Sequence, residues 1–257
     1  MGRPQAWAAV SVVVLALGLW PLSGSGAGAG TEARSAPMQA EPEETSRQLF
    51  ITGCSSCHGL DGRGTDRGPT LERSGAAAAY YYLSTGRMPL ADDTQPRRKQ
   101  PTYSPEEIEL LTAYVASIGE GPVVPEVDPA SGDLAQGGVL YRASCAACHA
   151  AAGIGGALSY GGSAPSLHSA EPRQIASAVR VGPGNMPASG PETFDEHEVA
   201  SLVRYVQFLQ DAPNPGGARL GGAGPIPEGF VGWLFGMGAL IAVTVWIGTG
   251  RPGKGRR

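Results

Sequence analysis

Two copies of the motif Cys-x-x-Cys-His constrain this sequence more than any other feature. They read CSSCH at residues 54–58 and CAACH at residues 145–149, and together they hold all four cysteines of the chain. This spacing is typical of covalent c-type haem attachment, in which two thiols bind the haem vinyl groups and the adjacent histidine ligates the iron. We therefore predict two covalently bound haem c groups. The predicted attachment residues are Cys54, Cys57, Cys145 and Cys148, and the predicted proximal iron ligands are His58 and His149.

Paired cysteines also occur in two other kinds of site. A structural zinc site uses C-x-x-C pairs, and so does a thioredoxin-like redox site. Neither needs a histidine directly after both pairs, and neither fits a helical repeat without strands. Covalent haem attachment is the better interpretation.

The chain overlays itself when it is shifted by 91 residues. The shift superposes the two motifs and, downstream of them, two apolar stripes with the i, i+3, i+7, i+10 spacing of an amphipathic helix. The stripes are Ile108, Leu111, Val115 and Ile118 in the first half and Val199, Leu202, Val206 and Leu209 in the second. Ser104 and Asp195 are the predicted N-caps of these closing helices, each with a glutamate three residues later. Each half is thus predicted as helix, haem motif, long loop and helix, which indicates a duplicated domain.

Each half also carries a Met-Pro pair in a Gly/Pro-rich loop. Met88 lies 30 residues after His58, and Met186 lies 37 residues after His149. A thioether favours Fe(II) and is a common second axial ligand in electron carriers. We predict Met88 and Met186 as the sixth iron ligands. A dihaem peroxidase needs an open iron position, so a methionine in both halves favours an electron carrier.

The alternative sixth ligands are His168 and His197, which both lie in the second half, and we expect both to be solvated surface residues. Pro69 and Pro165 follow the motif histidines by 11 and 16 residues. At this position the backbone carbonyl could accept a hydrogen bond from Nδ1 of the ligand histidine and fix its ring. The alternative interpretation of each proline is a simple turn.

Two further segments have open interpretations. The run Tyr80–Tyr82 is expected in the core or at its rim, with packing on a haem or a partner as the alternative. Arg97, Arg98 and Lys99 form a basic island in an acidic region. They could lie in a solvated loop, dock an acidic partner or neutralise a haem propionate.

The two ends of the chain indicate a membrane protein. An apolar run from Ala6 to Leu22 after Arg3 predicts a signal peptide or an uncleaved signal anchor. Phe230–Gly248 is a run of 19 uncharged residues, long enough to cross a bilayer. The basic residues that follow it predict a cytoplasmic C-terminus and extracytoplasmic haem domains.

The charge of the body argues against nucleic acid as a partner. Residues 31–212 contain 13 Lys and Arg and 22 Asp and Glu, a formal charge of −9. A phosphate backbone is bound by clustered basic residues, and this stretch is acidic.

Several stretches resemble the dihaem cytochrome c subunit of actinobacterial-type cytochrome bc complexes, the menaquinol:cytochrome c reductases. The matching stretches are CSSCHGLDGRGT, GRMP, PRRKQP, LTAYVASIG, CAACH, APSL, GPGNMP and PNPGG. The order of parts matches too, since two c-type domains precede one C-terminal membrane helix. The resemblance implies an all-α fold of two tandem class I cytochrome c domains followed by one transmembrane helix.

The resemblance also implies partners and a direction of electron flow. The implied partners are a cytochrome b subunit, a Rieske iron-sulfur subunit and a haem-copper cytochrome c oxidase. Electrons would pass from the Rieske cluster to the first haem, then to the second, then to the oxidase. The chain would serve a quinol:cytochrome c reductase, a translocase, as its electron-transfer subunit, with no quinol chemistry of its own. The alternative is a dihaem electron-transfer cytochrome of another periplasmic dehydrogenase or oxidase.

These observations predict eight segments. They are a signal segment (1–30), a flexible tether (31–44), the first cytochrome c domain (45–120), a linker (121–133), the second cytochrome c domain (134–212), a Gly/Pro linker (213–228), a transmembrane helix (229–248) and a basic cytoplasmic tail (249–257).

Overall fold

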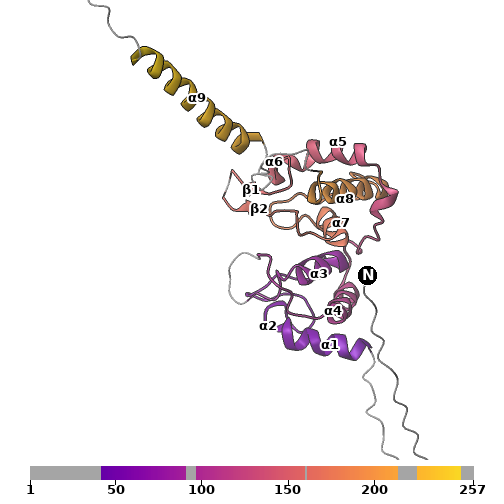
Figure 1. Cartoon of the computed structure of the whole chain (residues 1–257). Helices are drawn as coiled ribbons and strands as arrows, with labels where there is room; N and C mark the ends of the chain where they lie inside the picture. Colours follow the sequence, from indigo (N-terminus) through magenta and orange to yellow (C-terminus); the bar gives the residue numbers. More distant parts are fainter. Residues whose placement is uncertain (1–41, 91–96, 160, 214–224, 250–257) are drawn as a thin grey trace, which may run out of the picture. The chain divides into compact units, whose positions relative to one another are not determined.

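The computed structural model describes residues 42–90, 97–159, 161–213 and 225–249, and both halves of the repeat belong to one compact unit (Figure 1). The predicted signal segment, most of the predicted tether, and the tail from residue 250 onward lie outside the described residues. Among those described, helices predominate, as the predicted all-α class requires.

The two halves have the same order of helices. The first half contains α1 (Pro42–Gly53), α2 (Ser55–His58), α3 (Gly75–Ser84) and α4 (Pro105–Ile118). The second contains α5 (Leu134–Ser144), α6 (Ala146–His149), α7 (Pro172–Val181) and α8 (Glu196–Gln210). A short 3₁₀ turn, η1 (Pro129–Ser131), precedes α5, and α9 (Pro225–Thr249) follows the second half.

The closing helices α4 and α8 begin at the predicted caps. The Ser104 hydroxyl accepts a hydrogen bond from the Glu107 amide at 3.2 Å, and the Glu107 carboxylate accepts one from the Ser104 amide at 2.8 Å. Asp195 and Glu198 form the same reciprocal pair at 2.8 and 3.0 Å. Each pair satisfies two amides that would otherwise lack a partner at the helix start. The predicted capping of both helices is confirmed.

Equivalent residues form the core of each half. Phe50 on α1 and Tyr141 on α5 are almost completely buried. Phe50 packs on Tyr114 of α4 with ring centroids 4.8 Å apart, and Tyr141 packs on Tyr205 of α8 at 5.3 Å. The apolar stripes of α4 and α8 face these rings, with Leu111 and Leu202 among their most buried members. The internal repeat therefore extends from the sequence to the packing.

The structure differs from the sequence-based expectations in four places. Helix α1 begins at Pro42, inside the predicted tether, and α9 begins at Pro225, inside the predicted Gly/Pro linker. The loops between haem motif and closing helix contain α3 and α7, which the simple helix–loop–helix scheme lacked. Two-residue strands, β1 (Gly156–Ala157) and β2 (Ser163–Ala164), pair antiparallel in a segment expected to have no strands.

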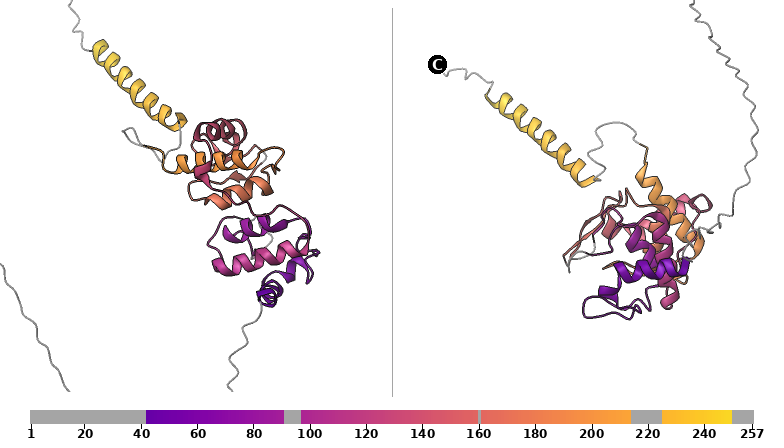
Figure 2. Two further views of the ribbon diagram at one scale, coloured as in Figure 1. Left: turned by 90° about the vertical axis from the view of Figure 1, so that its right-hand side faces the viewer. Right: turned by 90° about the horizontal axis from the view of Figure 1, so that it is seen from below.

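Helices α3 and α7 lie side by side and join the two halves (Figures 1 and 2). The Arg173 guanidinium lies 4.1 Å from the centroid of the Tyr80 ring and forms an ion pair with Glu109. The Gln174 side chain donates a hydrogen bond to the Ser84 carbonyl at 3.3 Å. Tyr80 is buried, so the expected core position of this tyrosine is confirmed.

Within the described residues, one helix is long and apolar enough to cross a membrane. It is the Gly229–Thr249 part of α9. Its large side chains are exposed, including Phe230, Trp233 and Trp246. Apolar side chains exposed around a whole helix are expected where lipid is the solvent.

Candidate haem sites

Each haem motif forms one helical turn directly after the first helix of its half. The Cys54 amide donates to the Phe50 carbonyl at 2.8 Å, and the Cys145 amide donates to the Tyr141 carbonyl at the same distance. Residues three and four apart lie on one side of a helical turn, so the two thiols and the histidine of each motif share a face. None of the four thiols is in a disulfide. Burial, with a smaller effect of the neighbouring Cys57 or Cys148, raises the pKa of Cys54 and Cys145 to about 11.

A proline carbonyl orients each motif histidine. His58 Nδ1 lies 2.8 Å from the Pro69 carbonyl oxygen, and His149 Nδ1 lies 3.0 Å from that of Pro165. Because a carbonyl can only accept, Nδ1 carries the proton and donates it, which leaves the Nε2 lone pair for a metal. Burial lowers the pKa of His149, while the bond to Pro165 opposes this shift, so the net effect favours the neutral ring. A neutral, oriented imidazole is what an iron ligand requires.

Both predicted methionines pack against the same core as the first cysteine of their motif. Met88 and Cys54 contact the core cluster around Phe50 and Leu111. Met186 and Cys145 contact the cluster around Tyr141 and Leu202. Each Met loop and each haem motif therefore pack on the core of the same half.

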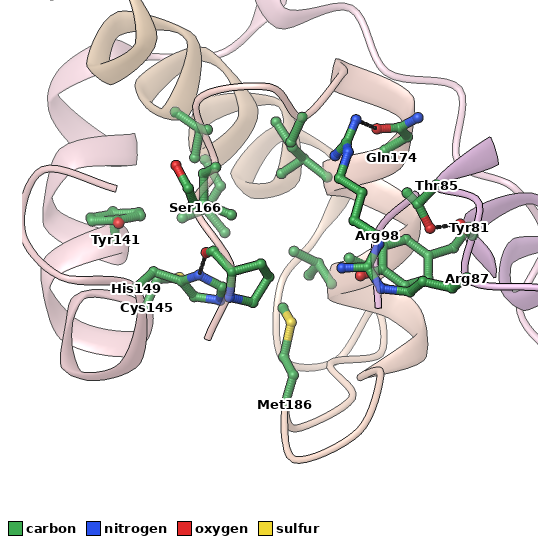
Figure 3. Close-up of a pocket in the computed structure, with 18 residues that line it drawn as sticks. Tyr81, Thr85, Arg87, Arg98, Tyr141, Cys145, His149, Ser166, Gln174 and Met186 are labelled. Atoms are coloured by element: carbon green, nitrogen blue, oxygen red, sulfur yellow. Dashed lines mark hydrogen bonds between the residues drawn. The ribbon is translucent and has the colours of Figure 1, made fainter. Parts of the chain in front are cut away.

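In the second half, two adjoining cavities separate the motif from the Met loop. The larger has a volume of about 520 Å³, within the roughly 300–1,000 Å³ typical of ligand and cofactor sites. Figure 3 shows the residues around the smaller cavity, where the Met186 side chain points inward, with Cys145 and His149 on one side and Arg87 and Arg98 on the other. Thiols for attachment, a neutral imidazole, a thioether and an apolar wall together fit a haem.

The alternative ligands lie elsewhere. His168 and His197 are exposed, as expected. His168 Nε2 lies 2.8 Å from the Ala152 carbonyl, so this nitrogen donates its proton to the backbone. Neither histidine lines the two cavities of the second half.

Arg180 holds the loop that carries Met186. It is 7% exposed, and its guanidinium donates to the Ser189 carbonyl at 3.2 Å, the Phe194 carbonyl at 2.6 Å and the Glu196 carboxylate at 2.8 Å. Gly182 ends α7 with φ +63°, where an added Cβ would lie 2.3 Å from the Ala188 amide nitrogen. The loop is therefore fixed at both ends by residues of this half.

We expect Arg180→Ala to destabilise the second domain by about 2–3 kcal/mol, because buried carbonyls lose their donors. It should also weaken the methionine-to-iron absorption band of the second haem, since the Met186 loop is released. Denaturant titration followed by that band and by circular dichroism measures both effects. Glu196→Gln is the matched control, because its 69% exposed side chain keeps an acceptor and should cost under about 1 kcal/mol. An Arg180→Ala variant as stable as that control would contradict the assignment.

Comparison with known proteins defines the class of the two halves. The family model for cytochrome c matches residues 44–119, and the model described as cytochrome c oxidase, cbb3-type, subunit III matches residues 132–206. Both halves are cytochrome c domains, a class that carries covalently bound haem c. The fold is therefore two tandem cytochrome c domains and one candidate membrane helix, as predicted.

Relatives over most of the chain define the family. A Mycobacterium tuberculosis protein named cytochrome bc1 complex cytochrome c subunit is 42% identical over 214 residues, which cover 79% of this chain and 76% of that protein. A Corynebacterium diphtheriae protein of the same name is 34% identical over 265 residues, or 94% of each chain. This chain belongs to the family of cytochrome bc1 complex cytochrome c subunits. The solved structure of cytochrome c4 from Pseudomonas stutzeri is 22% identical, covers 64% of this chain and 97% of its own, and has a TM-score of 0.25, too low to carry an argument.

Sequence reasoning missed three residues that shape the second site. Arg180 was hidden as one polar residue in a helix that had not been predicted, and Gln174 lies on the same helix. Arg87 was noticed only as part of the Met88 loop, yet it lines both cavities of the second half. Its only sequence signal is an arginine directly before the predicted ligand Met88, and that position does not indicate contact with the other half.

Proposed function

We propose that this chain is the dihaem electron-transfer subunit of a membrane-bound quinol:cytochrome c oxidoreductase. The observation that carries the proposal is the matched site in each half. A CxxCH turn, a histidine held by a proline carbonyl and a methionine on the same core recur in both halves. Haem iron, when bound, supplies a one-electron Fe(III)/Fe(II) couple.

The residues that would hold each group are those of its own half. Cys54, Cys57, His58 and Met88 would hold the first; Cys145, Cys148, His149 and Met186 would hold the second. In these sites Pro69 and Pro165 accept the Nδ1 proton, which would leave Nε2 of each histidine free to hold the iron. Met88 and Met186 would supply the second ligand to each iron, and an iron held on both sides would favour electron transfer over substrate binding.

We further propose the partners that belong to such a complex. A Rieske iron-sulfur protein would donate to the first domain beside a cytochrome b subunit, and the second domain would donate to a haem-copper oxidase. Family membership supports a place in a bc complex. A second candidate, service to another oxidase, is favoured by the match of residues 132–206 to the cbb3-type subunit model.

Affinity purification from mildly solubilised membranes tests the proposal. The full chain, tagged at its C-terminus, should co-purify with a protein that carries b-type haem and with an iron-sulfur protein. Optical and electron paramagnetic resonance spectra of the eluate identify both cofactors. Recovery of an oxidase without cytochrome b would favour service to another oxidase and contradict a place in a quinol:cytochrome c oxidoreductase.

The orientation of the chain can be checked separately. We propose that α9 anchors the chain with both cytochrome domains outside the cytoplasm and the residues after α9 inside. Protease added to intact spheroplasts should remove both covalent haems from the membrane but leave a C-terminal tag at full intensity. Loss of the tag before lysis, or haem protected until lysis, would contradict this orientation.

A further inference from the structure

The cavities of the second site contain positive charge from the first domain. Arg87 and Arg98 line both cavities, and Arg97 lines the larger one. No Asp or Glu is among the described residues that line either cavity. The surrounding body of the chain carries a net charge of −9 over residues 31–212, so this local excess of arginine is unusual for the molecule.

One of these arginines has a buried nitrogen without a hydrogen-bond partner. Arg87 is 8% exposed, and its Nη1 has no hydrogen-bond partner, the one charged group among four such buried side-chain atoms in the described part of the chain. The guanidinium lies 4.9 Å from the centroid of the Tyr81 ring, which supports one face of the group but accepts no directed hydrogen bond. Leaving a buried charged donor unsatisfied is more costly than leaving a neutral one unsatisfied. The site therefore calls for an anion.

Arg98 reaches the same place from a separate segment. Its Nη2 donates to the Ser169 carbonyl at 2.7 Å and to the Gln174 side chain at 3.2 Å, both in the second half. These bonds fix the side chain across the domain junction. Arg87 and Arg98 both line this pocket, and in Figure 3 they lie on the side away from Cys145 and His149.

The chemistry of haem supplies the anion. Its two propionates lie on the pyrrole rings opposite those that bear the vinyl groups, so attachment at Cys145 and Cys148 directs the carboxylates away from the motif. We propose that Arg87, with Arg98, pairs with the propionates of the haem in the second domain. Guanidinium groups suit this role because they bind carboxylates through two parallel hydrogen bonds. The inference rests on the proposed haem in that site.

In this assignment, two adjacent residues of one loop contact two different haems. Met88 faces the core of the first domain, whereas Arg87 faces the cavity of the second. The first domain thus supplies side chains that complete the haem site of the second domain. A positive charge beside a propionate stabilises Fe(II) relative to Fe(III), so it raises the midpoint potential of that haem.

Redox titration of the purified, haem-loaded full chain tests the proposal. Arg87→Gln should lower the Fe(II)/Fe(III) equilibrium constant of the second haem at least tenfold. For a one-electron couple this corresponds to a fall of about 59 mV in the midpoint potential. The first haem should move by less. Arg87→Lys should restore most of the potential because it keeps the charge. Arg67→Gln, at an exposed arginine of the first domain, is the matched control and should move neither haem.

Arg98→Gln provides a second variant that does not depend on a buried side chain. Because Arg98 is exposed, solvent should reduce its effect, but the shift should have the same sign and fall on the same haem. A second-haem potential unchanged in Arg87→Gln and Arg98→Gln, with two haems still bound, would overturn the inference and leave the proposed function intact. A chain without haem in the second domain would instead refute the proposed function.

Discussion

Replacing Cys145 and Cys148 together with alanine should halve the covalent haem content of the chain, from two groups to one. Without either thiol the second domain cannot form thioether bonds, while Cys54 and Cys57 are untouched. The mass of the denatured chain should fall by one haem beyond the change of the two side chains. Haem staining and absorbance per chain measure the same ratio.

The loss of this haem should also destabilise the second domain. Its cavity of about 520 Å³ would be left without the group that fills it, and the side chains around the cavity would lose the packing contacts that this group provides. Thermal unfolding should show an early transition confined to that domain. Cys54→Ala with Cys57→Ala should produce the mirror result in the first domain. Ser56→Ala, inside the first motif but at no attachment position, is the control and should retain two haems. A Cys145/Cys148 variant that still carries two covalent haems would contradict the attachment sites.

Met186→Ala should remove the near-infrared methionine-to-iron band of one haem and lower its midpoint potential. Loss of a thioether ligand destabilises Fe(II), and axial ligation sets haem potentials over a range of about 0.8 V, so a fall of roughly 0.1–0.3 V is expected. The opened iron should then bind carbon monoxide. Met88→Ala should do the same to the other haem, and the double variant should lose the band completely.

The competing histidines provide the controls for this prediction. His168 and His197 are exposed and lie outside both cavities, so changing either to glutamine should leave the band and both potentials unchanged. A methionine-to-iron band of full intensity in Met186→Ala would show that Met186 is not a sixth ligand. A fully six-coordinate, unreactive iron in Met186→Ala would show that another side chain already closes that position.

Local patterns allowed the sequence to predict the closing helices and their caps. Ser104 and Asp195 each form their capping hydrogen bonds with a residue three positions later, so the capping boxes can be predicted without knowledge of the fold. The apolar stripes of α4 and α8 likewise follow from periodicity alone. The histidine-to-proline hydrogen bonds span 11 and 16 residues, and they could be anticipated because the matched placement occurs twice.

Features that depend on contact between the two halves could not be predicted in this way. Helix α3 is a run of alanines and tyrosines without a clear apolar stripe, and it packs both on α4 of its own half and on α7, about ninety residues away in the chain. The role of Arg87 depends on the same contact. Its charge, burial and unsatisfied nitrogen indicate an anion site only when the cavity of the other domain is known. The short β1–β2 pair lies within the second half, and its two residue pairs are too few to give the alternating pattern that predicts a strand.

The contact between α3 and α7 also limits how this architecture can grow. The two helices occupy equivalent places in the repeat, each lying between a haem motif and a closing helix. Equivalent surfaces that meet each other form an isologous contact, which closes after two copies, whereas head-to-tail contacts can continue without end. A third cytochrome domain added in tandem would find this face already occupied on both existing domains. A further cytochrome domain would therefore have to pack on this pair through a different surface.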